Sequence, residues 1–166
     1  MGKINRPKID IPKTKIEWML DIVGYIALTS MVVLLLMNWS SLPDEVPAHF
    51  GATGEVDRWG SKMELLIIPG IAVFLHVFMM IIEKVPETHN YPARLNESNA
   101  RAFYTNSRQT LNYLKNLIDV MFAYTVYNSI SIALGSKSTL GWPFFIILGL
   151  IIIVTIWKTV KMFKIK

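Results

Sequence analysis

Four apolar stretches constrain this chain more than any other feature. A helix of about 20 predominantly apolar residues crosses the hydrocarbon layer of a bilayer, which is about 30 Å thick. Composition agrees, since 52% of the residues are hydrophobic and only 17% are charged. The sequence therefore predicts an all-α, polytopic membrane protein, a single domain over residues 1–166. Its four transmembrane helices are expected near Met19–Trp39, Glu64–Glu83, Leu114–Leu134 and Trp142–Val160.

The distribution of lysine and arginine predicts the orientation. These residues gather in the arm 1–18, the connector 84–113 and the tail 161–166, whereas the segment 40–63 holds only Arg58 and Lys62. Basic loops stay on the cytoplasmic side. We therefore expect a multi-pass protein of the cell membrane with both termini in the cytoplasm. The lysines are read as partners of lipid headgroups, or of a cytoplasmic partner, and not of nucleic acid.

The connector before the third apolar stretch is expected to become helical. No proline interrupts the chain from Asn96 to Leu134, and apolar residues recur there at helical spacing. The third transmembrane helix should therefore extend by several turns into the cytoplasm, against headgroups or neighbouring segments.

The segment between the first two apolar stretches has the composition of an ordered loop. It combines two prolines and three glycines with aromatic and charged side chains, which a mere spacer does not need. One interpretation is recognition of a peptide, a lipid headgroup or a partner protein at the outer face. The other is a lid whose charges pair with one another. The candidate ligand-binding residues are His49, Phe50, Glu55, Asp57, Arg58, Trp59 and Lys62.

An enzymatic alternative uses the same loop. His49, Glu55 and Asp57 could hold a metal or form an acid–base set for hydrolysis. The chain has no cysteine and no His-x-x-x-His pair, so no catalytic residue, metal or cofactor is assigned.

Polar residues inside the apolar stretches form a second candidate site. Such groups are costly in hydrocarbon and should face the interior of the bundle. A contact between His76 and Asp119 is geometrically allowed. The cluster is read either as interhelical hydrogen bonding or as the proton or cation site of a small transporter. Its predicted members are Asp21, His76, Glu83, Asp119, Tyr127 and Asn128.

Two runs of residues resemble a known family. The first, from Leu42 to Lys62, reads LPDEVPAHFGATGEVDRWGSK and is followed by Pro69; the second, from Asn90 to Tyr104, reads NYPARLNESNARAFY. Both resemble the bacterial and archaeal membrane family called domain of unknown function 1648. That module also forms the N-terminal part of SdpI-type immunity proteins, which protect cells against a secreted killing peptide. The resemblance thus implies a prokaryotic membrane protein and an immunity-like role.

Together these observations favour a non-enzymatic membrane protein of sensing, signalling or immunity type that recognises a partner at its outer face. The two alternatives are a membrane-embedded hydrolase built around His49 and a transporter that uses His76 and Asp119.

Overall fold

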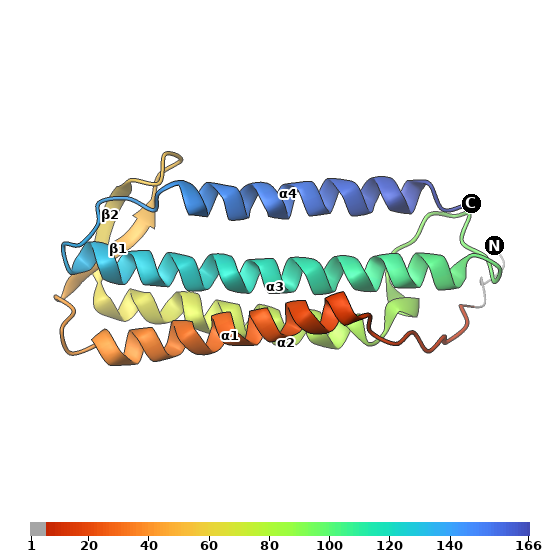
Figure 1. Cartoon of the computed structure of the whole chain (residues 1–166), viewed down its shortest axis with the longest axis horizontal. Coiled ribbons are helices and arrows are strands. Elements are labelled where there is room, and N and C mark those ends of the chain that lie inside the picture. Colours follow the sequence, from red (N-terminus) through yellow and green to blue (C-terminus); the bar gives the residue numbers. More distant parts are fainter. Residues whose placement is uncertain (1–5) are drawn as a thin grey trace.

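The computed structural model describes residues 6–166, so Lys3 of the predicted basic arm lies outside the described residues. The described residues form a bundle of four antiparallel helices with a hairpin at one end (Figure 1). The C-terminus and the segment that leads into the first helix lie at the opposite end. The helices are α1 (Lys15–Asn38), α2 (Ile67–Glu83), α3 (Ala100–Ala133) and α4 (Trp142–Phe163). Two short 3-10 helices, η1 (Lys62–Leu66) and η2 (Pro86–Thr88), flank α2.

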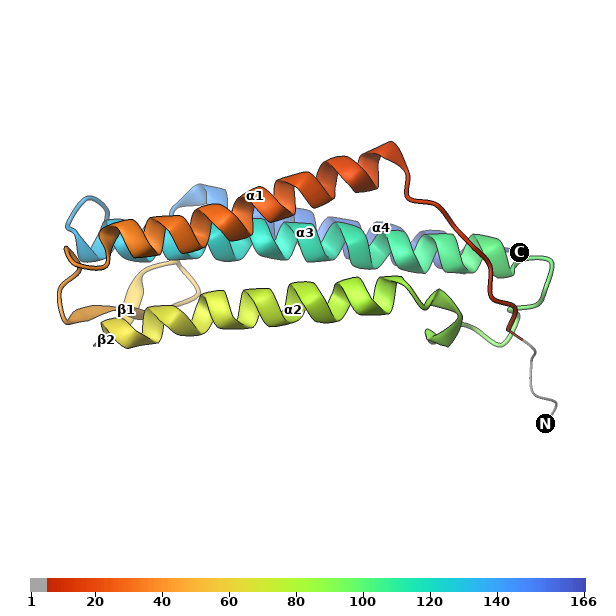
Figure 2. The same ribbon diagram turned by 90° about the horizontal axis from the view of Figure 1, so that it is seen from below.

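Helix α3 is the centre of the bundle. It packs against each of the other three helices, whereas α1 and α2 make few contacts with each other. Figure 2 shows α1 and α2 separating toward the end that leads into α1. Any side chain of α3 that faces inward therefore meets a neighbouring helix.

The structure contains helices long and apolar enough to cross a membrane, although not at all four predicted stretches. Within the described residues, three helical segments are long and apolar enough to cross a membrane: Lys15–Asn38, Lys62–Glu83 and Trp142–Phe163. The predicted third stretch, Leu114–Leu134, is helical but lies in α3, which is not among them. Helix α3 falls below that level of hydropathy because it carries many polar residues. Most of its buried residues are polar and face the other helices.

The helix boundaries differ from the predicted ones for local reasons. Helix α1 begins at Lys15 because Thr14 accepts a hydrogen bond from the backbone N–H of Glu17, whose carboxylate accepts one from the N–H of Thr14. This reciprocal capping box satisfies two backbone donors at a helix start. Helix α3 is continuous from Ala100, as the absence of proline predicted.

The segment between α1 and α2 is a β-hairpin, which the all-α prediction did not include. Strands β1 (Glu45–Phe50) and β2 (Val56–Ser61) pair antiparallel, with an irregular register around His49. Gly54 has a φ of 81° in the connecting turn, a conformation that favours glycine. The segment is thus ordered, as predicted, but through strand pairing.

Apolar side chains gather at the two ends of the bundle. Beneath the hairpin, Met31 and Leu35 of α1 pack with Val46 of β1 and Val126 of α3. At the other end, Phe103 and Tyr104 of α3 pack with Leu95, and the segment 9–11 and the C-terminal residues cover them. The polar residues described next lie on α3 and its neighbours between these clusters.

Candidate functional site

Two carboxylates and two ammonium groups meet inside the bundle. Lys115 of α3 lies 3.0 Å from Asp21 of α1 and 2.9 Å from Glu83 of α2. Lys13, which precedes α1, lies 2.6 Å from Asp21 and 3.3 Å from Glu83. The side chain of Lys115 is 1% exposed, whereas that of Lys13 is 25% exposed. We call Lys13, Asp21, Glu83 and Lys115 the ionic quartet.

Amide side chains complete the quartet. Asn112 and Asn116 of α3 donate hydrogen bonds to Oδ1 of Asp21 at 2.8 and 3.1 Å. A buried charge is tolerated only where its partners replace the lost water. Burial alone would lower the pKa of Lys13, but the hydrogen bond to Asp21 and the charges of Asp21 and Glu83 hold it above its ordinary value.

A second ion pair lies about two turns from Lys115 along α3 toward Ala100. Arg108 donates to Glu17 at 2.9 Å, and it also donates to the carbonyl oxygens of Ile11 and Pro12. The pair therefore ties the segment before α1 to the central helix.

The predicted contact between His76 and Asp119 is present in the structure. Nδ1 of His76 lies 2.7 Å from Oδ2 of Asp119, and Tyr25 covers the imidazole with its ring centre 5.0 Å away. His76 is 4% exposed, and its Nε2 has no hydrogen-bond partner among residues 6–166. The pair lies one turn beyond Lys115 toward the hairpin.

Tyr127 and Asn128 lie outside this cluster, contrary to the prediction. Asn128 accepts a hydrogen bond from Lys137 of the α3–α4 loop at 2.9 Å, and Tyr127 is 43% exposed. Helical periodicity placed Asn128 on the buried side of α3 correctly and Tyr127 wrongly, and it does not give the depth of a residue along the bundle. Asn128 is twelve residues beyond Asn116, about 18 Å along the axis.

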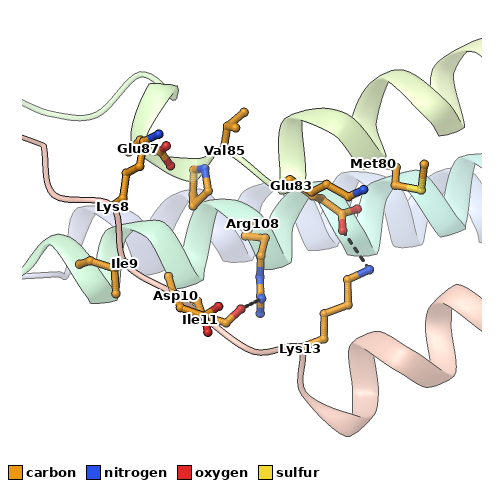
Figure 3. A pocket seen from close by; sticks show the side chains of 12 residues that line it. Lys8, Ile9, Asp10, Ile11, Lys13, Met80, Glu83, Val85, Glu87 and Arg108 are labelled. Carbon is orange, nitrogen blue, oxygen red and sulfur yellow. Dashed lines mark hydrogen bonds and ion pairs between the residues drawn. The ribbon is translucent and has the colours of Figure 1, made fainter.

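A cavity of about 640 Å³ leads to the ionic quartet. Figure 3 shows it between the segment before α1, the end of α2 and Arg108, with Lys13 reaching across to Glu83. Its lining residues are Lys8, Ile9, Asp10, Ile11, Lys13, Met80, Glu83, Lys84, Val85, Pro86, Glu87 and Arg108.

The sequence interpretation missed several residues of this polar interior. One signal could have found some of them: Arg108, Asn112 and Lys115 precede the predicted Asp119 at intervals of three and four, on one face of a helix. Lys158 of α4 had no such signal. It is buried, donates to Gln109 at 2.8 Å and lies over the ring of Tyr113. Lys13 lies outside the helices, so periodicity could not place it.

Several charged residues of the hairpin and of the residues next to it form ion pairs. Nδ1 of His49 lies 2.6 Å from Asp57, and Arg58 lies 2.8 Å from Glu64. Lys62 lies 3.8 Å from Asp44. These pairs fit the interpretation of the hairpin as a lid. Phe50 is half-buried opposite Val56 in the hairpin.

Trp59 and Glu55 lie apart from those pairs, at an open pocket of about 510 Å³. The pocket lies between β2 and the α3–α4 loop, where Glu55 pairs with Thr139 through the backbone. Trp59 is 49% exposed. The pocket is lined by Glu55, Val56, Trp59, Ile132, Lys137, Ser138 and Thr139.

The proposed metal set on the hairpin is not assembled. His49 and Asp57 are paired, but Glu55 lines the pocket beside Thr139. Across residues 6–166, no group of three or more His, Asp or Glu side chains is arranged to hold a metal ion. A metal-assisted hydrolase therefore finds no ligand set in the described part of the chain.

Comparison with known proteins places one segment in a family. Residues 26–73 match the model of the domain of unknown function DUF1648. An uncharacterised protein of Archaeoglobus fulgidus is 41% identical over 86 residues, which cover 51% of this chain and 45% of the relative, so the match spans about half of each. No solved structure matches the chain. The segment that comprises the second half of α1, the hairpin and the start of α2 is thus similar to the DUF1648 family, which its loop residues resemble.

Proposed function

We propose that this membrane protein recognises an amphipathic peptide at the outer face of the cell membrane, in a sensing, signalling or immunity role. The observation that carries the proposal is the open pocket between β2 and the α3–α4 loop. The positive-inside distribution predicts that this end faces outward. Its volume lies within the range of small-molecule and cofactor sites.

The chemistry of the pocket supports a peptide ligand. Trp59 and Ile132 offer apolar surface, and a half-exposed indole is a frequent anchor in binding sites. Glu55 suits an ammonium group, while Lys137 at the same pocket suits a carboxylate. Arg58 and Lys62 are paired with Glu64 and Asp44, so binding is assigned to Trp59, Glu55 and Lys137 instead.

The transporter alternative receives less support from the packing. The pair His76–Asp119 is buried next to the ionic quartet. From Ala72 toward the hairpin, apolar side chains such as Met31 and Val126 form a core cluster, and no ionisable side chain of α1, α2 or α3 is buried there among the described residues. Such packing favours closure of that half of the bundle and a structural or sensing role for the pair.

Photo-crosslinking tests the proposal in cells that naturally make the protein. p-Benzoylphenylalanine in place of Ser138, which is exposed at the pocket, should give a light-dependent peptide adduct. The same residue in place of Ala52, exposed in the hairpin turn, is the matched control and should not. Trp59→Ala should abolish the Ser138 adduct without lowering the amount of protein in the membrane.

Two results would contradict peptide recognition. Adducts at Ser138 that consist of phospholipid would identify the pocket as a lipid-facing surface. Equal adducts at Ser138 and Ala52, insensitive to Trp59→Ala, would show that the pocket does not bind a peptide specifically and that the hairpin serves as a lid.

A further inference from the structure

The ionic quartet draws one of its four charges from outside the helices. Asp21, Glu83 and Lys115 belong to α1, α2 and α3, and each is almost completely buried. These three groups comprise two carboxylates and one ammonium, which leaves one negative charge uncompensated. Lys13 supplies the missing positive charge from the irregular segment before α1. An interior built by the helices alone is therefore one cation short.

Lys13 lies at the edge of the cavity and contacts both carboxylates of the quartet. Its Nζ reaches Oδ2 of Asp21 and Oε2 of Glu83, the carboxylate oxygens that Lys115 does not contact. The side chain lines the 640 Å³ cavity and remains partly exposed, in contrast to Lys115. Glu83 itself lines the cavity, and an ammonium that took the place of Lys13 would meet Oε2 of Glu83 and Oδ2 of Asp21.

The segment that carries Lys13 is attached to α3 largely through its own backbone carbonyl groups, which accept hydrogen bonds from arginine side chains. Arg101 donates to the carbonyl of Asp10 at 3.2 Å, and Arg108 donates to those of Ile11 and Pro12. In its present position Nζ of Lys13 also lies 5.5 Å from the ring centre of Trp18, within cation–π range. The indole therefore remains within reach of the ammonium if Lys13 leaves the two carboxylates.

We propose that Asp21 and Glu83 form a binding site for a primary ammonium group, reached through the cavity on the predicted cytoplasmic side, in which Lys13 is a tethered occupant that an external alkylammonium ion displaces. A primary ammonium carries three N–H donors and fits two carboxylates at once. The alkyl part has apolar walls available in Ile11, Met80 and Val85. Lys8 and Lys84, also at the cavity, are exposed, so salt screens their repulsion.

Chemical rescue tests the site in the full-length protein in detergent. Lys13→Ala leaves a buried carboxylate without its cation and should lower the thermal midpoint by several degrees. Methylammonium chloride should restore the midpoint along a saturable curve. Tetramethylammonium chloride at equal ionic strength should not, because it lacks N–H donors. Lys84→Ala, which removes a lysine of the same cavity without an ion pair to either carboxylate, is the matched control and should show no rescue.

Hydrogen exchange on the wild-type protein tests displacement without any variant. Methylammonium should increase amide exchange in residues 8–13 in proportion to occupancy, and tetramethylammonium should not. Equal responses to both salts would overturn the site. Rescue of Lys13→Ala combined with an unaffected wild-type segment would make Lys13 a permanent structural cation and overturn displacement.

Discussion

The buried acidic side chains obey one rule, in that each has a cationic or imidazole partner on another segment. Glu17 pairs with Arg108, Glu83 with Lys115, and Asp119 with His76. In hydrocarbon an isolated charge costs several kcal/mol, so such residues must face protein partners. Each pair therefore joins two segments as well as neutralising a charge, and the positions of these few residues help to fix how the helices meet.

Gly24 is the position where this packing leaves least room. A Cβ there would lie 2.1 Å from Oδ1 of Asn116 and 3.0 Å from Oδ2 of Asp119. Neither group can move freely, because Asn116 is bonded to Asp21 and Asp119 to His76. Gly24→Ala should therefore lower the free energy of unfolding by about 1–3 kcal/mol in denaturant melts.

Gly70 provides the control for that substitution. It also lies within a helix, but apart from its chain neighbours and the adjacent backbone of its own helix, an added Cβ meets no atom of residues 6–166 within 4 Å. Gly70→Ala should leave stability unchanged or raise it by roughly 0.5–1 kcal/mol, since alanine is the better helix former. Equal effects of the two substitutions would mean that α1 and α3 are not in close contact at Gly24.

Helix α3 reverses the pattern of a surface helix in a water-soluble protein. Its most buried side chains include Asn112, Lys115 and Asn128, whereas α4 exposes Ile146, Ile153 and most of its other apolar residues. Lipid is the solvent for the outer helices, so apolar residues face outward and polar residues find partners inside. The most polar of the four helices is accordingly the central one.

This arrangement makes an apolar substitution inside α3 destabilising. Asn112→Leu conserves most of the volume but removes the donors to Asp21 and Glu83. We expect a loss of about 1–3 kcal/mol in unfolding free energy, because a buried carboxylate keeps fewer partners. Ala102→Leu, at an exposed site of the same helix, should change stability little. A neutral result for Asn112→Leu would show that the quartet does not depend on its amides.

The sequence predicted the helices, whose positions are set by local patterns of apolar residues and proline. It did not predict the contacts between segments that are distant in the chain. Length and hydropathy located the predicted spans, and the absence of proline predicted the early start of α3. The capping box at Thr14 and Glu17 is also a local sequence pattern, and it marks the start of α1 four residues before the predicted one. The hairpin depends on pairing between two short irregular strands, and the position of Lys13 depends on how a non-helical segment packs against α3 and the end of α2. No periodicity encodes either of these.

The whole molecule divides along its length. The ionic quartet and its cavity lie toward the end that holds residues 84–99 and the C-terminus, while an apolar cluster underlies the hairpin. Basic residues are also more numerous at the first end, which the positive-inside rule assigns to the cytoplasm. Both proposed sites depend on this orientation, since it decides which aqueous phase reaches each pocket.

The absence of cysteine from the chain allows that orientation to be tested one position at a time. Ala52 in the hairpin turn and Ala93 before α3 are both exposed, so Ala52→Cys and Ala93→Cys should disturb neither folding nor packing. In intact cells, a membrane-impermeant maleimide should label Ala52→Cys and spare Ala93→Cys. A permeant maleimide should label both, which controls for accessibility. Labelling of Ala93→Cys alone would reverse the orientation, and the hairpin pocket would then face the cytoplasm.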